Sequence, residues 1–177
     1  MAVFLETIRL LDRSAAEAET DLKTRRMGLL MGILLRPFSE QPRSLEAAIR
    51  NELRLREIRA RLFGGDDAGA RDAIHGWSTG SLASSPELLR DLAETYSRLD
   101  AFELAAEVQR VRARQLASGS LPWLDARYGL ALAYFRAGRG KDAIGLIDAT
   151  AILHPDLGGG ELRNKFIRLR QRIEPAP

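Results

Sequence analysis

The sequence contains no cysteine. Disulfide bonds, thiolate metal sites and cysteine nucleophiles are therefore excluded, and a reducing compartment fits this absence. Long apolar runs are also missing, since the longest is the nine residues from Met27 to Leu35, whereas a membrane-spanning helix needs about 20. The next residues, Arg36-Pro37-Phe38, lack the small side chains of a signal-peptide cleavage site. We expect a cytoplasmic chain with no membrane insertion.

The sequence also lacks clustered catalytic or metal-binding residues. Its two histidines, His75 and His154, are isolated, whereas zinc and catalytic sites group such side chains at short spacing. The glycines at 158–160 lack the lysine and the following Ser/Thr of a phosphate-binding loop. We therefore expect no catalytic residues, no metal and no cofactor, and we do not expect an enzyme.

Lysine is scarce, with only Lys23, Lys141 and Lys165 among the 27 basic residues. The arginines are spread among 24 acidic residues, which leaves a net charge of +3. Nucleic-acid binders concentrate positive charge on one face, whereas this mixing is typical of a solvated helical surface. Nucleic-acid binding through the arginines of the last predicted helix is therefore the least favoured function.

Good helix-forming residues dominate the sequence, and the apolar residues follow a helical period. Ser14 with Glu17 has the pattern of a capping box, Pro37 predicts a helix end, and Ser85-Pro86-Glu87 predicts a helix start. The segment from Ser78 to Ser85 is rich in Ser and Gly and predicts a linker. Together these signals predict an all-α protein with helices over 2–12, 14–36, 44–63, 67–77, 86–99, 102–117, 121–138, 140–153 and 161–173.

The second predicted helix carries an apolar stripe through Leu22, Leu29 and Ile33. Residues at this spacing share one helix face, so we expect the stripe to face the core. Gly28 and Gly32 lie four residues apart in the same helix, which predicts that a neighbouring helix approaches it closely.

Residues 124–157 contain small, large and turn residues at fixed offsets. Small residues at positions 8 and 20 would let two antiparallel helices touch, an aromatic residue at position 11 would wedge between them, and glycine would make the turn. The residues that carry this pattern are Leu130, Ala131, Tyr134, Gly138, Ala143, Ile147, Thr150 and Pro155. The segment resembles a tetratricopeptide (TPR) repeat of about 34 residues.

Residues 86–119 resemble a second, weaker copy, which departs from the pattern at Gln109, Arg112 and Ala117. Residues 52–84 resemble a degenerate copy, in which Arg59 occupies a position that requires a small residue and Trp77 fits the second helix. The resemblance implies a right-handed α-solenoid of antiparallel helix hairpins. We expect an N-terminal helical segment at 1–43, a degenerate hairpin at 44–85, two TPR-like repeats at 86–157, and a C-terminal capping helix and tail at 158–177.

TPR-like arrays bind partner proteins on the face formed by the first helix of each repeat. The resemblance therefore implies a protein-interaction module, such as an adaptor, scaffold or accessory subunit, that binds a peptide or helix. The apolar helix from Met27 to Leu35 is the other candidate surface for docking a protein partner. The implied partner-binding residues are Arg90, Glu94, Arg98, Tyr128, Leu132 and Phe135. Glu94 and Leu132 stand where carboxylate-clamping TPR proteins have asparagine, so we do not expect a carboxylate clamp.

Two alternatives follow from the same residues. Tyr128, Leu132 and Phe135 would instead pack on the chain's own terminal helices. In the second alternative, the chain is a self-assembling structural subunit that forms a homo-oligomer through its N-terminal helices. The sequence does not identify the partner.

Overall fold

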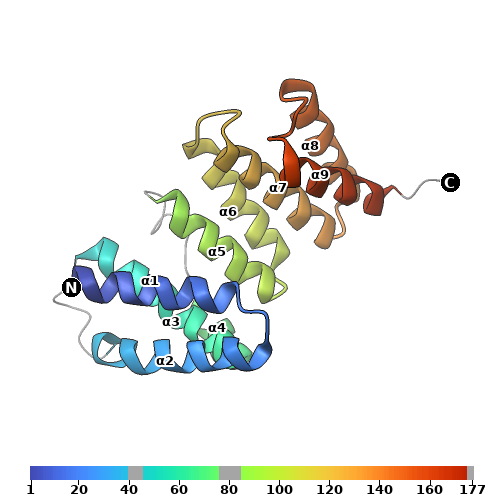
Figure 1. Ribbon diagram of the computed structural model, residues 1–177. Coiled ribbons are helices and arrows are strands. Elements are labelled where there is room, and N and C mark those ends of the chain that lie inside the picture. Colours follow the sequence, from blue (N-terminus) through green and yellow to red (C-terminus); the bar gives the residue numbers. More distant parts are fainter. Residues whose placement is uncertain (40–45, 76–84, 175–177) are drawn as a thin grey trace. The chain divides into compact units, whose positions relative to one another are not determined.

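The computed structural model describes residues 1–39, 46–75 and 85–174, and in these ranges the chain forms nine helices and no strand (Figure 1). The helices pack as sequential antiparallel pairs, which confirms the predicted all-α fold. They are α1 (Ala2–Ala16), α2 (Asp21–Ser39), α3 (Ala47–Gly64), α4 (Asp67–Ile74), α5 (Pro86–Arg98), α6 (Phe102–Gln115), α7 (Leu121–Arg136), α8 (Gly140–Leu153) and α9 (Gly160–Ile173). The chain divides into two compact units, unit 1 (Met1–Leu82) and unit 2 (Ala83–Pro177), and each is described by itself.

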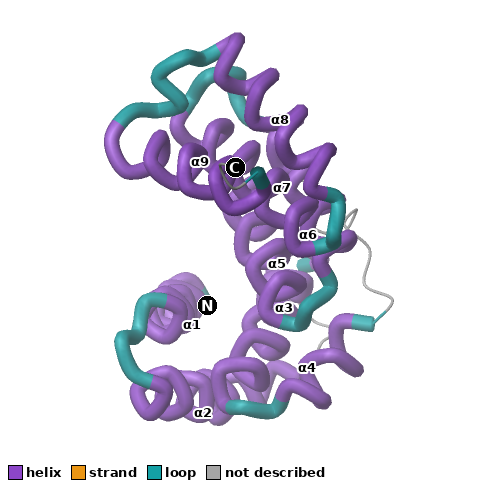
Figure 2. Tube along the Cα trace, turned by 90° about the vertical axis from the view of Figure 1, so that its right-hand side faces the viewer, coloured by secondary structure: helices purple, strands orange, loops and turns teal. Residues whose placement is uncertain are grey.

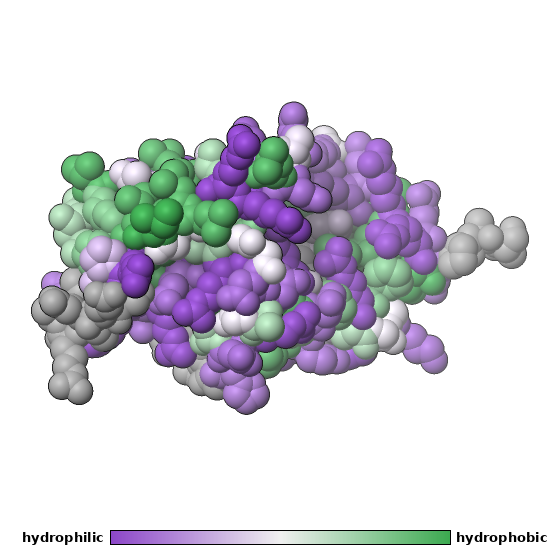
Figure 3. Space-filling model, turned by 90° about the horizontal axis from the view of Figure 1, so that it is seen from below, coloured by the Kyte–Doolittle hydropathy of each residue, from purple (hydrophilic) through white to green (hydrophobic). Residues whose placement is uncertain are grey.

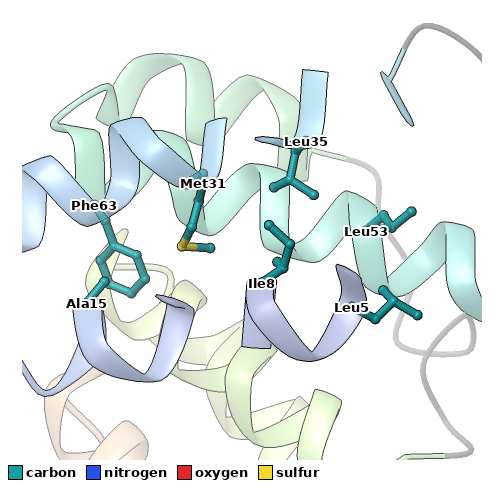
Figure 4. Close-up of a cluster of buried hydrophobic side chains, with 8 residues drawn as sticks. Leu5, Ile8, Ala15, Met31, Leu35, Leu53 and Phe63 are labelled. Atoms are coloured by element: carbon teal, nitrogen blue, oxygen red, sulfur yellow. The ribbon is translucent and has the colours of Figure 1, made fainter. Parts of the chain in front are cut away.

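Unit 1 contains α1 to α4. Helices α1 and α2 both pack on α3, which also packs on α4. Figure 4 shows the core of this unit, to which three helices contribute; its buried residues include Leu5, Ile8, Ala15, Met31, Leu35, Leu53 and Phe63.

Three predicted helix boundaries in unit 1 are wrong. Helix α1 continues to Ala16, so Ser14 lies inside it and caps nothing, and α2 begins only at Asp21. Pro37 does not end α2, which continues to Ser39. A proline costs less here than in a helix interior, because the only hydrogen bond that it removes lies in the last turn.

The predicted orientation of α2 is also wrong. Leu22, Leu29 and Ile33 are 59%, 62% and 69% exposed, whereas Met31 and Leu35 are buried against α1 and α3. The run from Met27 to Leu35 is apolar on every side, so its period could not indicate which side the neighbouring helices cover.

Some predicted features of unit 1 lie outside the described residues, namely the helix start at 44, the fit of Trp77 and the linker from Ser78. Helix α4 begins with an N-cap at Asp66, whose carboxylate accepts a hydrogen bond from the backbone N–H of Gly69 at 2.9 Å.

Unit 2 contains two helix hairpins, α5–α6 and α7–α8, and α9 packs on both helices of the second hairpin (Figure 2). The predicted start at Ser85-Pro86-Glu87 is confirmed, because the Ser85 hydroxyl accepts a hydrogen bond from the backbone N–H of Leu88. Ser120 caps α7 in the same way. These caps fix where the first helix of each hairpin begins.

Candidate partner-binding site

The two hairpins of unit 2 have the expected close packing. Ala93, Ala105, Ala131 and Ala143, which occupy positions 8 and 20 of the two copies, are all fully buried. The ring of Tyr134 is nearly buried, its hydroxyl accepts a hydrogen bond from Arg110 at 2.7 Å, and the Arg139 guanidinium lies 4.4 Å from the ring centroid. Small residues thus let the helices approach each other, and the aromatic ring lies where the repeat pattern requires it.

Two departures from the repeat pattern are accommodated by neighbouring residues. A β-carbon placed on Gly129 would come within 2.6 Å of the Gln109 side chain, so the absence of a side chain at 129 makes room for Gln109. The buried guanidinium of Arg112 forms an ion pair with Asp125 of α7 at 2.8 Å. Each departure in α6 therefore has its partner in α7.

A groove of about 490 Å³ opens beside this ion pair, between α5, the junction of α6 and α7, and α9. Three basic and three acidic residues line it, together with apolar side chains and prolines. The charged residues are Glu87, Arg90, Arg112, Asp125, Glu161 and Lys165, and the apolar ones include Leu116, Leu121 and Leu162. A groove with balanced charges and apolar patches is suited to a polar peptide that also carries apolar side chains.

The charges at the α9 rim of this groove are paired. The Lys165 ammonium lies 2.9 Å from the Glu161 carboxylate, one helical turn away. The hydrogen bond with Glu161 raises the pKa of Lys165, and the same bond lowers the pKa of Glu161. Both groups are therefore ionised near neutral pH.

Only one of the six predicted site residues lines this groove. Arg90 is exposed, and its guanidinium lies 3.5 Å from the neighbouring Asp91 carboxylate. Glu94 and Arg98 lie further along α5 and form an ion pair with each other at 3.2 Å. The structure thus places these three charged residues on one helix but not in one groove.

The other three predicted residues, Tyr128, Leu132 and Phe135, pack against α9 and are half-buried. The Tyr128 ring meets Phe166 edge to face at a centroid distance of 5.4 Å, and the Arg172 guanidinium lies 5.4 Å from the Phe135 centroid. This is the alternative arrangement that the sequence left open. A role of these residues in partner binding stays a prediction.

The sequence interpretation did not include Arg112, Glu161 and Lys165 in the site. Arg112 counted only as a departure from the repeat, and the pairing with Asp125 joins residues 13 positions apart. The position of α9 depends on the turn at Gly158 and Gly159, both of which have positive φ. From the sequence, these glycines were considered only as a possible phosphate-binding loop. The spacing of Glu161 and Lys165, at i and i+4 in a predicted helix, was the available signal.

Neither histidine lies in a cluster of possible metal ligands, and within the described ranges no three His, Asp or Glu side chains are placed to hold a metal ion. His154 packs edge to face on Trp123, with ring centroids 5.2 Å apart. A β-carbon on Gly119 would come within 2.5 Å of the same imidazole. Packing accounts for the position of His154.

No family model matches the chain, and no curated protein sequence matches it. Two crystal structures of a Podosopora anserina kinesin light chain with nearly identical TPR-like repeats, one of them a point variant, are similar to it. The variant has a TM-score of 0.66 at 15% identity, over 96% of this chain and 85% of that one. The other has a TM-score of 0.60 at 14% identity, over 97% and 99%. The chain therefore has a TPR-like repeat fold.

Among the helices that the structure describes, none is both long and apolar enough to cross a lipid bilayer.

Proposed function

We propose that this chain is an adaptor or accessory subunit that binds a peptide or helix of a partner protein on the first-helix face of unit 2. The groove beside Arg90 carries this proposal, because it combines an accessible volume of about 490 Å³ with charged and apolar residues on three sides. TPR-like folds present their first helices for this purpose.

The partner segment would contact Arg90 within the groove and continue along α5 to Glu94 and Arg98. Arg90 is exposed, and its ion pair with the Asp91 carboxylate is long, at 3.5 Å. Its guanidinium can therefore donate hydrogen bonds to a second partner. Arginine is suited to this role because its planar fork donates paired hydrogen bonds to carboxylates and carbonyl groups.

Tyr128, Leu132 and Phe135 would contribute from the margin of α9, which leaves each of them partly exposed. Aromatic side chains dominate interface energies when a partner desolvates them. In this proposal α9 holds the rings in place, and the partner covers the part that α9 leaves open.

Photo-crosslinking tests the proposal and captures the partner in the same step. A benzophenone amino acid would replace Glu87, which lines the groove, or Arg114, which is exposed outside it. In the native host we expect a discrete protein crosslinked from position 87 and not from 114. Adding Arg90→Glu should reduce the yield from position 87. Equal crosslinking from both positions, or no effect of Arg90→Glu, would contradict the proposal.

A further inference from the structure

A second surface, in unit 1, also has the properties of a docking site. The outer face of α2 carries Leu22, Leu29 and Ile33, all more than half exposed. Figure 3 shows hydrophobic side chains gathered on the side of the molecule to which α2 belongs. Single exposed leucines are common, but an apolar ridge along one helix is typical of an interaction site.

A groove of about 520 Å³ runs beside this ridge, between α2 and α3. Leu29 and Ile33 form one side, and Ala60 and Gly64 of α3 contribute to the other. A β-carbon on Gly32 would meet no atom within 4 Å, so this glycine leaves space open along the groove. The surface is therefore an apolar ridge beside a groove. A partner helix can place its side chains into such a groove, whereas a flat bilayer surface cannot.

The charges around the ridge are mainly positive. Three arginines flank the ridge on α2, because each lies three or four residues from a ridge residue. Arg25 and Arg26 lie between Leu22 and Leu29, and Arg36 follows Ile33. Arg25 and Arg26 form no ion pair with any residue that the structure describes.

The acidic residues on the opposite side of the groove already have partners. Glu57 is paired with Arg61 at 2.9 Å, and Asp66 caps α4. The surface therefore combines an apolar ridge with an excess of arginine.

We propose that this surface docks an amphipathic helix of a partner protein, one whose apolar stripe is flanked by Asp and Glu. The apolar stripe would fill the groove beside Leu29 and Ile33, and the acidic flanks would face Arg25, Arg26 and Arg36. Helix-in-groove binding of this kind uses apolar residues at i, i+4 and i+7, and complementary charges set orientation and association rate.

A second copy of this chain fits the surface less well. Two α2 helices packed in parallel would bring Arg25 and Arg26 against their own copies. In the antiparallel orientation, Arg36 of one copy would approach the Arg25 end of the other. Like charges brought together at an interface are destabilising. The charge pattern therefore favours an acidic partner over self-association.

An anionic membrane surface fits less well too. A bilayer would cover the ridge but leave the hollow beside Gly32 unfilled. It would also bring lipid phosphates to the rim that carries Glu57 and Asp66. This inference concerns unit 1 and goes beyond the function proposed for the groove in unit 2, so each can fail without the other.

Fluorescence anisotropy with a designed probe tests the inference. The probe is a labelled helical peptide of about five turns, with leucines at i, i+4, i+7 and i+11 flanked by glutamates. We expect saturable binding to the whole chain that weakens as salt is raised, since exposed charges are screened. A peptide with lysine in place of every glutamate should bind about tenfold more weakly or worse, because its flanks repel the arginines.

Three variants locate the binding. Leu29→Ser removes part of the ridge, and Gly32→Leu places a side chain in the hollow, where its β-carbon has no atom within 4 Å. Both should weaken binding by about tenfold or more. Leu10→Ser is the control, because it removes another exposed leucine of unit 1, 53% exposed on α1, outside the groove. It should leave binding unchanged, and circular dichroism should show that all three variants remain folded.

The inference is overturned if the lysine peptide binds as well as the glutamate peptide, or if Gly32→Leu has no effect. It is also overturned if the chain sediments with phosphatidylserine vesicles but does not bind the peptide. A dimer in sedimentation velocity that Leu29→Ser dissolves would assign the surface to self-association instead.

Discussion

The α-carbon of Gly28 lies directly against the backbone of Gly64, since a β-carbon on Gly28 would come within 2.5 Å of the Gly64 nitrogen. Helix α2 therefore meets the end of α3 backbone to backbone. Gly32, one turn further along the same helix, has open space at the corresponding position.

These two glycines give opposite predictions for the same substitution. Gly28→Ala must push α2 away from α3, and we expect it to lower the free energy of unfolding by about 1–3 kcal/mol. Gly32→Ala meets no neighbour and should raise it by about 0.5–1 kcal/mol, because alanine loses less backbone entropy in a helix. Urea unfolding of the two variants compares them directly, and equal effects would contradict the packing of α2 on α3.

Asp12 provides a second prediction. This residue is 1% exposed, and its carboxylate accepts hydrogen bonds from two buried arginines, Arg59 at 2.7 Å and Arg56. Asp12→Asn would remove the carboxylate that both guanidinium groups share, while Arg56 would keep its longer pair with Glu52 at 3.6 Å. We therefore expect a loss of about 3–5 kcal/mol in the free energy of unfolding. Glu57→Gln is the control, because it breaks the more exposed pair with Arg61 and should cost less than about 1 kcal/mol. Similar losses in the two variants would be evidence against a buried Asp12.

Glu52 makes the stability of unit 1 depend on pH. Burial raises the pKa of Glu52, but the hydrogen bond and charge of Arg9, together with Arg56, outweigh burial and lower the pKa below its ordinary value of 4.5. Since the folded-state pKa is the lower one, the ionised carboxylate stabilises the fold above about pH 4.5. This contribution is lost as the pH falls through the folded-state pKa.

We therefore expect the free energy of unfolding to fall below pH 4.5, and Glu52→Gln to make this fall shallower. Urea unfolding at a series of pH values measures both profiles. Parallel profiles for the parent and the variant would show that Glu52 does not contribute to the acid sensitivity.

Ala143 tests the hairpin of α7 and α8. It is fully buried, so Ala143→Leu should overpack the contact and cost about 1–3 kcal/mol. Ala149 lies on the same helix but is exposed, and Ala149→Leu should change stability by less than about 0.5 kcal/mol. A melting temperature that is the same for both variants would mean that the register of the repeat is wrong.

Tyr128 and Phe166 should be coupled energetically, because their rings meet edge to face. In a double-mutant cycle with Tyr128→Leu and Phe166→Leu we expect a coupling of about 0.5–1.5 kcal/mol in the free energy of unfolding. A cycle that pairs Phe166→Leu with Tyr96→Leu, on α5, is the control and should show no coupling. Additive effects in the first cycle would argue that α9 does not hold the Tyr128 ring.

The repeat was predictable where its signals are local. Ala131, Tyr134, Gly138 and Ala143 lie at fixed spacing within one hairpin. The structure confirms the packing of Ala131, Tyr134 and Ala143, and Gly138 has the positive φ of a turn. The buried side of α2 was not predictable in this way, since a helix that is apolar all round turns to the core whichever side its neighbours cover. Leu29 is exposed because α1 and α3 meet the opposite side.

The candidate site shows the same limit. Arg90 was identified from its repeat position and lines the groove. Lys165 lies there because the turn before α9 brings that helix back over α7, and the period of α9 alone does not specify its direction. The partners of Arg59 and Arg112 were missed for a related reason, because ion pairs between distant residues leave no periodic signal.

The pairing of Arg59 with Asp12 has a consequence for modularity. In repeat proteins each hairpin contacts only its neighbours, and consensus repeats form similar contacts throughout the array, so such a repeat can be copied or moved within it. The α3–α4 hairpin cannot be moved in this way, because its buried Arg56 and Arg59 both pair with Asp12 of α1, which lies 47 residues before Arg59. A graft of this hairpin would have to include α1, or replace both Arg56 and Arg59 with uncharged residues.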